Sequence, residues 1–202
     1  MSVAAILTGK GGSKLKDKNI LMVDGKPCLY FPCMAAKEVK KIDHFFVSSE
    51  NKKILKFAKN YGYNIINRPK KLSKTNSQHI DVIIHALKHL EKKAIKPKIL
   101  VILLANAPII YSSWIKDCIN ILQKNKLATS VVPVIQNNDH HPMRAKKIKN
   151  GFLTQHNKIK AKISTNRQDL VSNYFLCHNF WVIKTENIYS NNGELPWIFF
   201  KR

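Results

Sequence analysis

Short apolar runs alternate along this 202-residue chain with segments whose apolar residues recur at helical spacing. The runs 3–7 and 98–104 are almost continuously apolar, as strands buried on both faces of a parallel sheet are. Residues 80–90 instead place apolar side chains three and four positions apart, which predicts a helix packed by one face. This alternation predicts an α/β fold, a Rossmann-like three-layer sandwich with a mostly parallel sheet.

Two other segments also fit an α/β fold. Residues 27–41 are expected to form a helix opened by Pro27, and residues 174–184 are expected to form one late strand. We expect residues 1–202 to make a single domain, with residues 136–170 projecting from it as an arm.

The charge of the chain is strongly positive, but it comes almost entirely from lysine. The formal net charge is +23, with 31 lysines and four arginines. Arginine is the usual reader of bases and phosphates, so a nucleic-acid-binding domain is the weaker interpretation. A solvated lysine surface or attraction for small anions accounts for the excess better. The sequence has no apolar run long enough to span a membrane, and its first residues do not follow the order of a secretory signal, so we expect a cytoplasmic protein.

A glycine-rich loop with two lysines, residues 8–14, follows the first apolar run. Ligands of open α/β sheets bind beyond the carboxyl ends of the strands, and glycines let backbone N–H groups approach an anion there. The loop lacks the ending of a Walker A motif and is not a G-x-G-x-x-G fingerprint. A phosphate site and a tight strand-to-helix turn are both open interpretations.

An ordered series of short motifs extends from this loop nearly to the end of the chain. These motifs are Gly11-Gly12-Ser13-Lys14, Lys18-Asn19, Gly25-Lys26-Pro27, Phe46-Val47-Ser48-Ser49, Lys59-Asn60-Tyr61-Gly62, Arg68-Pro69 with Leu72, residues 80–87, His140-His141-Pro142, Arg167-Gln168-Asp169-Leu170 and Gly193 with Pro196-Trp197. In this order the series resembles the acylneuraminate cytidylyltransferases, also called CMP-sialic acid synthetases. The resemblance implies a nucleotidyltransferase that moves CMP from CTP to a sialic-acid-like 2-keto sugar acid and releases pyrophosphate.

The resemblance also implies a role for individual residues. The nucleotide would be bound by Lys10, Gly11, Gly12, Ser13, Lys14, Asn19, Arg68 and Ser77. The reaction centre would contain Lys18 and Arg167, and the sugar would contact Arg144, Asn106 and Gln168. The lysines also have an alternative interpretation as ordinary surface residues, and Arg68 as a turn residue tied to a carboxylate.

The chain departs from the family at positions that bear on metal and sugar binding. The resemblance implies Mg²⁺, but the Asp-x-Asp motif that holds it in the family is absent from these 202 residues, so its ligands are not identifiable. Lys10 stands where the family has an arginine, and Ala105-Asn106-Ala107-Pro108 replaces a glutamine-containing motif that touches the sugar. The sugar could therefore be a related nonulosonic acid, and a catalytically degenerate nucleotide-binding homologue is the alternative. The family's arm builds a homodimer, which we also expect here.

Overall fold

The computed structural model describes residues 1–12, 15–156 and 164–189 of the chain. These residues belong to two compact units: unit 1 is Met1–Pro133 with His178–Arg202, and unit 2 is Val134–Cys177. The expected arm, residues 136–170, lies within unit 2, and its projection stays a prediction. Ser13 and Lys14, two of the predicted nucleotide ligands, lie outside the described residues.

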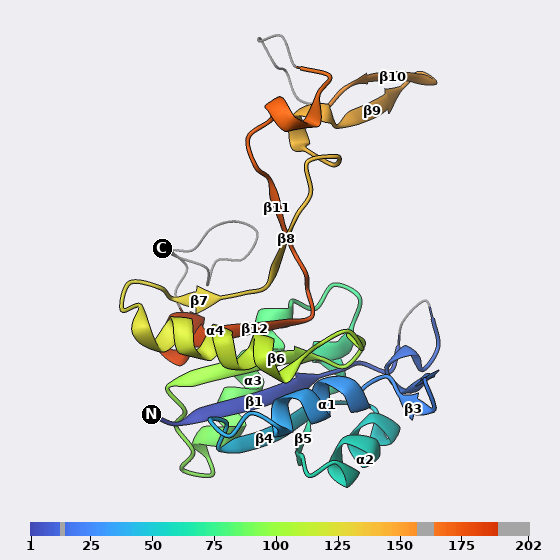
Figure 1. Ribbon diagram of the computed structural model, residues 1–202. Helices are drawn as coiled ribbons and strands as arrows, with labels where there is room; N and C mark the ends of the chain where they lie inside the picture. The colour runs from blue at the N-terminus through green and yellow to red at the C-terminus, as the bar shows by residue number, and fades with distance from the viewer. Residues whose placement is uncertain (13–14, 157–163, 190–202) are drawn as a thin grey trace. The chain divides into compact units, whose positions relative to one another are not determined.

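The core of unit 1 is a six-stranded sheet in the order β5-β4-β1-β6-β12-β7 (Figure 1). Four strands run parallel: β1 (Val3–Thr8), β4 (His44–Ser49), β5 (Asn64–Asn67) and β6 (Ile99–Leu104). Strand β12 (Phe180–Lys184) is antiparallel to β6, and β7 (Ser130–Val131) is antiparallel to β12. The mostly parallel α/β sheet predicted from the sequence is thus confirmed.

Helices cover both faces of this sheet and make it the middle of three layers (Figure 1). Along β1, Val3, Ala5 and Leu7 pack in one buried cluster, together with residues of α1 (Tyr30–Lys37), α2 (Lys52–Asn60) and α4 (Ser112–Lys124). Ala4 and Ile6 pack in the other cluster with α3 (His79–Glu91). Successive strand residues face opposite sides, so the continuous apolar run of β1 serves two cores at once.

Two expected elements differ from the structure. Strand 174–184 is divided into β11 (Tyr174–Leu176) and β12, because the backbone of His178 adopts a left-handed conformation with φ of 48° that no strand continues through. Helix 27–41 is shorter than expected, since Pro27 ends strand β3 (Lys26–Pro27), which pairs with β2 (Met22–Val23). The φ that proline fixes is compatible both with the first turn of a helix and with the end of a short strand, so Pro27 alone does not distinguish the two.

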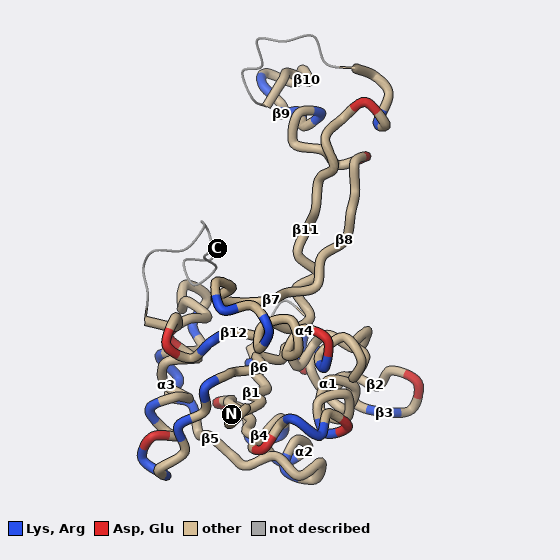
Figure 2. Tube along the Cα trace, turned by 60° about the vertical axis from the view of Figure 1, so that its left-hand side comes forward, with Lys and Arg blue, Asp and Glu red and all other residues tan. Residues whose placement is uncertain are grey.

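The described residues of unit 1 also form three 3-10 turns in the loops around the sheet. They are η1 (Lys18–Ile20), η2 (Lys70–Ser73) and η5 (Thr185–Tyr189). Lysines and arginines are spread over several elements of this unit, including α2 and α3 (Figure 2). Such a spread is the one expected of a solvated lysine surface.

Outside residues 157–163, unit 2 consists of two short antiparallel strand pairs and two 3-10 turns. Strand β8 (Val134–Gln136) pairs with β11, and β9 (Lys146–Lys149) pairs with β10 (Phe152–Gln155). Asn150 and Gly151 connect β9 to β10 with φ values of 50° and 81°, as in a type I′ hairpin turn. The 3-10 turns are η3 (Pro142–Arg144) and η4 (Arg167–Asp169). Within the described residues, no helix is both long and apolar enough to cross a lipid bilayer.

Candidate active site

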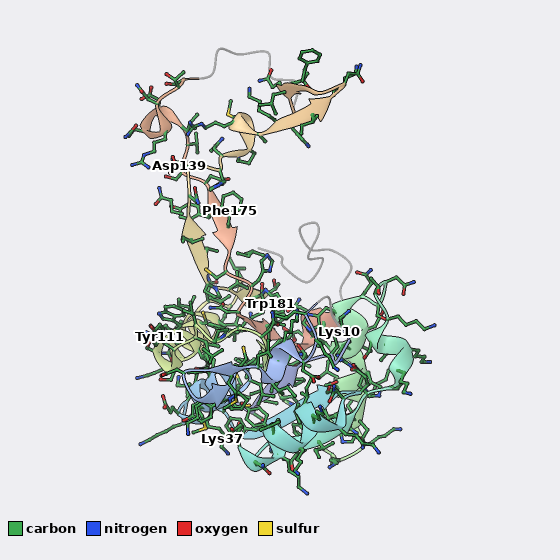
Figure 3. All side chains as sticks on the ribbon, turned by 90° about the vertical axis from the view of Figure 1, so that its right-hand side faces the viewer. Lys10, Lys37, Tyr111, Asp139, Phe175 and Trp181 are labelled. Atoms are coloured by element: carbon green, nitrogen blue, oxygen red, sulfur yellow. The ribbon has the colours of Figure 1, made fainter. Side chains whose placement is uncertain are left out.

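A cleft of about 400 Å³ opens in unit 1 beyond the carboxyl ends of β1 and β6. This is the edge of the sheet at which the sequence predicts ligand binding. Six predicted site residues line it together: Lys10, Lys18, Asn19, Arg68, Ser77 and Asn106. Lys10 and Trp181, which both line the cleft, are labelled in Figure 3. The cleft therefore brings together residues from the glycine-rich loop, η1, the end of β5, the start of α3 and the loop after β6.

The glycine-rich loop passes so close to its neighbours that a Cβ at two of its glycines would require a neighbouring side chain to shift. A Cβ on Gly9 would lie 3.0 Å from Cβ of Ala105 and 3.3 Å from Nδ2 of Asn19. A Cβ on Gly11 would overlap Nδ2 of Asn51 and lie 3.0 Å from its Cβ. Gly12, in contrast, has no atom within 4 Å of a Cβ built on it. Packing against Asn19, Asn51 and Ala105 thus constrains the backbone at Gly9 and Gly11.

Asn19 holds the loop from the side of η1. Its side chain is buried, and Nδ2 donates a hydrogen bond of 2.8 Å to the carbonyl oxygen of Lys10. Its own carbonyl accepts a hydrogen bond of 2.9 Å from the N–H of Leu29, which precedes α1. These contacts position Lys10, and a contact of Asn19 with the nucleotide itself stays a prediction.

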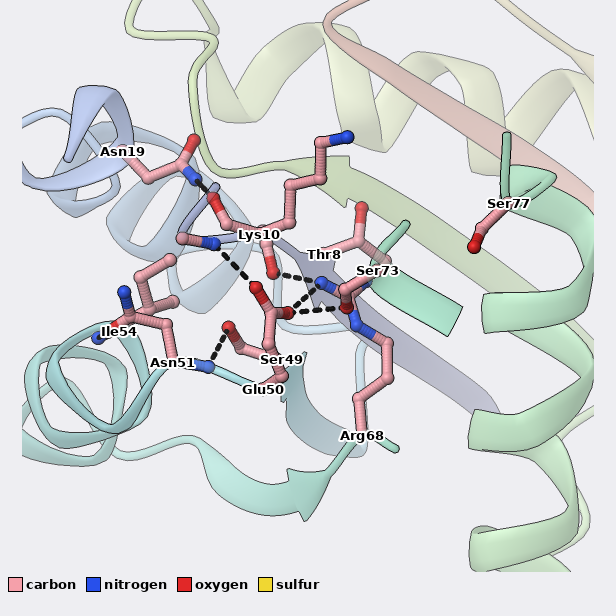
Figure 4. A network of polar contacts seen from close by, with 12 residues as sticks. Thr8, Lys10, Asn19, Ser49, Glu50, Asn51, Ile54, Arg68, Ser73 and Ser77 are labelled. Carbon is pink, nitrogen blue, oxygen red and sulfur yellow. Dashed lines mark hydrogen bonds and ion pairs between the residues drawn. The ribbon is translucent and has the colours of Figure 1, made fainter. Parts of the chain in front are cut away.

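Arg68 is buried below the loop and forms an ion pair with Glu50 (Figure 4). Its Nη2 donates to Oε2 of Glu50 at 2.7 Å and to the carbonyl oxygen of Gly9 at 2.6 Å. This is the carboxylate-tied arrangement that the sequence left open as an alternative. Because Arg68 also lines the cleft, the predicted nucleotide contact remains compatible with it.

Glu50 accepts further hydrogen bonds from two other elements. Its Oε1 accepts from the N–H of Gly11 at 2.7 Å, and its Oε2 accepts from Oγ of Ser73 at 2.6 Å. Burial alone would raise the pKa of this carboxyl group, but the hydrogen bonds from Ser73, Arg68 and Gly11 outweigh it and lower the pKa to about 2. The N–H of Gly11, expected to face a phosphate, is therefore already bonded to a carboxylate in this structure.

A neutral histidine forms part of the cleft wall. Nε2 of His79 lies 3.0 Å from Oγ1 of Thr8, whose hydroxyl donates to the carbonyl oxygen of Leu103 at 3.2 Å. The hydroxyl has one proton, so Nε2 of His79 is the donor in the first contact. Burial, and secondarily the charge of Arg68, lowers the pKa of His79 to about 4. The His79 ring also contacts Trp181, with ring centroids 5.4 Å apart.

Two further predicted residues of the cleft, Ser77 and Asn106, are less enclosed. Oγ of Ser77 donates to the carbonyl oxygen of Lys71 at 2.8 Å, which fixes the turn before α3. Asn106 is exposed in the loop after β6 and lines the cleft.

The carboxylates in the described part of unit 1 do not fit a protein-held Mg²⁺ ion at the cleft. Both oxygens of Glu50 accept hydrogen bonds from Gly11, Arg68 and Ser73. Over the described ranges, no group of three or more His, Cys, Asp or Glu side chains is arranged to hold a metal ion. Nucleotide-bound Mg²⁺ is held by one or two protein carboxylates together with phosphates and water, and no Asp or Glu is among the described residues that line this cleft.

The other predicted residues gather in unit 2 around one carboxylate. Nη1 of Arg167 lies 3.1 Å from Oδ2 of Asp139, and Nη1 of Arg144 lies 3.8 Å from Oδ1 of the same residue. Arg167, Gln168 and Asp139 line a cavity of about 570 Å³ within this unit. The three predicted residues Arg144, Arg167 and Gln168 thus lie near one another along the described part of unit 2.

Sequence reasoning missed Glu50 and His79. Glu50 had a detectable signal, because it directly follows strand β4 in a chain with only 12 acidic residues. A carboxylate at the carboxyl end of a parallel strand is placed at the ligand-binding edge. His79 had no comparable signal, since its significance depends on Thr8 and Trp181, which are distant in sequence.

The fold and the cleft define an α/β protein with a cationic ligand site at the strand ends. A family model described as cytidylyltransferase matches residues 4–180. The chain belongs to the cytidylyltransferase family.

Relatives of known name agree with this family at moderate identity. The chain is 27% identical over 174 residues to a Helicobacter pylori protein named pseudaminic acid cytidylyltransferase and UDP-2,4-diacetamido-2,4,6-trideoxy-beta-L-altropyranose hydrolase, covering 86% of this chain and 32% of that protein. It is 29% identical over 152 residues to N-acylneuraminate cytidylyltransferase of Oncorhynchus mykiss, covering 74% of this chain and 33% of that protein. The chain thus spans about a third of the length of these curated relatives.

Solved structures share the fold. A CMP:2-keto-3-deoxy-manno-octonic acid synthetase complexed with CTP aligns with a TM-score of 0.67 at 12% identity, covering 93% of this chain and 76% of that chain. A 4-diphosphocytidyl-2C-methyl-D-erythritol synthase from Anaerococcus prevotii aligns with a TM-score of 0.59 at 17% identity, covering 93% of this chain and 73% of that chain. These alignments confirm the nucleotidyltransferase-like α/β fold.

Proposed function

We propose that this chain transfers CMP from CTP to a sialic-acid-like 2-keto sugar acid and releases pyrophosphate. The family match over residues 4–180 supports the use of CTP. The names of the two relatives, one for pseudaminic acid and one for N-acylneuraminate, support an acidic sugar as the acceptor.

The observation that carries the proposal is the placement of Lys10 and Lys18 in one cleft at the carboxyl end of β1. In the proposed reaction, the anomeric hydroxyl oxygen of the sugar attacks the α-phosphorus of CTP in line. A new O–P bond forms, the bond from the α-phosphorus to the oxygen bridging to the β-phosphate breaks, and the hydroxyl proton passes to solvent. The two ammonium groups would offset the charge of the triphosphate and of the departing pyrophosphate. Because the described carboxylates do not fit Mg²⁺, no step is assigned to a metal ion.

The acidic group of the sugar is assigned to Arg144 and Arg167. Their shared contact with Asp139 supports this assignment, because it places two guanidinium groups around a single carboxylate. A sugar carboxylate presents the same two oxygens and would take the place of Asp139 to form charge-assisted hydrogen bonds with these donors. Gln168, beside Arg167 in the same cavity, would contact a sugar hydroxyl.

The test measures pyrophosphate release from CTP, with ATP and UTP as competing nucleotides, in the presence of N-acylneuraminate, pseudaminate or 2-keto-3-deoxy-manno-octonate. We expect release with CTP and at least one of these acids, and about a tenfold or larger fall in kcat/KM for CTP in Lys18→Ala. Lys116→Ala, an exposed lysine of α4 outside the cleft, is the matched control. CTP binding without release with any acceptor would favour the degenerate homologue.

A homodimer is part of the same proposal, since the family's arm builds one. Light scattering of the purified chain at tens of micromolar should give twice the mass of one chain. A monomer at this concentration would remove the dimer from the proposal and leave the cleft chemistry untouched.

A further inference from the structure

We propose that Glu50 is a positioning residue of the CTP site, which holds the glycine-rich loop and the Arg68 guanidinium in the arrangement that receives the triphosphate. This inference rests on the proposed function and deepens it. Glu50 does not touch the ligand and acts through Gly11 and Arg68.

Glu50 joins three separate parts of the chain through one carboxylate (Figure 4). Oε1 accepts the N–H of Gly11 in the loop after β1 at 2.7 Å. Oε2 accepts from Arg68 after β5 at 2.7 Å and from Ser73 in η2 at 2.6 Å. Glu50 itself follows β4, so its side chain ties together the ends of three adjacent parallel strands. Removing the carboxylate would release all three contacts at once.

Only an ionised carboxylate satisfies this set of neighbours. Gly11 and Arg68 present N–H groups and Ser73 presents an O–H group, so every partner is a donor. A glutamine amide has one acceptor oxygen, and its NH₂ group would be directed at another donor. The side chain of Arg68 is only 4% exposed and that of Glu50 14%, so water cannot readily replace the lost contacts.

The ion pair also explains how a carboxylate can stand beside a site for an anion. Arg68 neutralises the charge of Glu50 through Nη2, and the same atom is anchored to the carbonyl oxygen of Gly9. Nε of Arg68 is buried and has no hydrogen-bond partner among the residues that the structure describes. This N–H therefore lies inside the protein, and the contacts with Glu50 and Gly9 fix the plane of the guanidinium at the cleft wall.

The experiment compares Glu50→Gln with Glu50→Asp and with Glu186→Gln, an exposed carboxylate of η5 with the same change in charge. Steady-state kinetics give KM for CTP and KM for the sugar acid separately. We expect Glu50→Gln to raise KM for CTP about tenfold without changing KM for the acceptor. Glu50→Asp retains the charge and should recover part of this loss, and Glu186→Gln should match the wild type.

A second readout does not depend on turnover. Hydrogen–deuterium exchange of a peptide spanning residues 8–20, without nucleotide, should be faster in Glu50→Gln than in the wild type and unchanged in Glu186→Gln. Unaltered exchange in this peptide would overturn the positioning role. The positioning role would also be overturned if KM for CTP were unaltered and kcat fell only by the fraction of protein that is unfolded. That pattern is the one that a general loss of stability produces. A wild type that neither binds CTP nor releases pyrophosphate would overturn the proposed function, and the exchange result would still decide whether Glu50 positions the loop.

Discussion

Replacing Gly11 by alanine tests the close approach between the glycine-rich loop and helix α2. A Cβ at position 11 would overlap Nδ2 of Asn51 and lie 3.0 Å from both Cβ and Cγ of that residue. Asn51 is the N-cap of α2, and its Oδ1 accepts from the N–H groups of Lys53 at 2.8 Å and Ile54 at 3.3 Å. Gly11→Ala should therefore displace the capping side chain, although the φ of Gly11 is not in the left-handed region.

The magnitude follows from the cap and from a neighbouring glycine. Loss of an asparagine N-cap destabilises a protein by about 1 kcal/mol. Any glycine-to-alanine change also stabilises by about 0.4–1 kcal/mol through the unfolded chain, where the backbone is compatible. Gly12→Ala experiences only this second effect, since nothing lies within 4 Å of its Cβ. Gly11→Ala should thus be less stable than Gly12→Ala by about 1 kcal/mol.

The assay is urea unfolding of both variants, repeated in an Asn51→Gly background. Glycine is itself an acceptable N-cap and removes the atoms that the new methyl group would meet. The difference between the two alanine variants should then shrink to below about 0.5 kcal/mol, which identifies Asn51 as the coupled residue. Equal stabilities of Gly11→Ala and Gly12→Ala with Asn51 present would refute the packing argument.

Two further predictions concern acid stability. The pKa of Glu50 falls from 4.5 to about 2 on folding, so its stabilisation is fully present above pH 4.5 and is lost as the pH falls through 2; it amounts to at most about 3 kcal/mol. Urea unfolding from pH 6 to pH 3 should show a smaller acid loss in Glu50→Gln than in the wild type, and equal losses would contradict the low pKa. The pKa of His79 falls from 6.5 to about 4, so the folded state disfavours its proton and stability declines as the pH falls from 6.5 through 4. An NMR titration of its imidazole should show a midpoint well below 6.5, and His79→Gln, which keeps a donor toward Thr8, should flatten this part of the stability profile.

The architecture of unit 1 was predictable because its strands and helices have different hydrophobic periods. The run 3–7 is apolar at every position because alternate residues of β1 enter two different cores. The break at His178 was not predictable, since residues 174–184 carry no glycine or proline at the point where the backbone becomes left-handed. Pairing of β11 with β8 and of β12 with β6 places the two halves in different sheets, and tertiary pairing overrides the local strand pattern there.

The position of the cleft was also predictable, because a glycine-rich loop after a buried strand occupies the ligand-binding edge of a parallel sheet. Six predicted residues line that cleft, although their nucleotide and sugar contacts stay predictions. Pattern alone does not separate a residue that binds a ligand from one that holds the site in place. Asn19 and Arg68 match family positions, but in the structure both side chains donate hydrogen bonds to the protein itself. Asn19 donates to a backbone carbonyl, and Arg68 donates to a backbone carbonyl and to the carboxylate of Glu50.

The excess of lysine and the Glu50–Arg68 pair lead to one physical account of the cleft. Lysine ammonium groups are flexible point charges, so Lys10 and Lys18 can follow a triphosphate but cannot define its orientation. Orientation requires rigid donors, and the planar guanidinium of Arg68 is anchored by the carbonyl of Gly9 and by the carboxylate of Glu50. In such a site the lysines supply charge and the Glu50–Arg68 pair supplies a fixed geometry. Loss of a lysine should therefore weaken CTP affinity in a salt-dependent way, whereas loss of Glu50 should weaken CTP affinity at every salt concentration. Measuring CTP affinity of Lys18→Ala and Glu50→Gln at low and high salt distinguishes the two roles, and identical salt dependence in both variants would contradict this division.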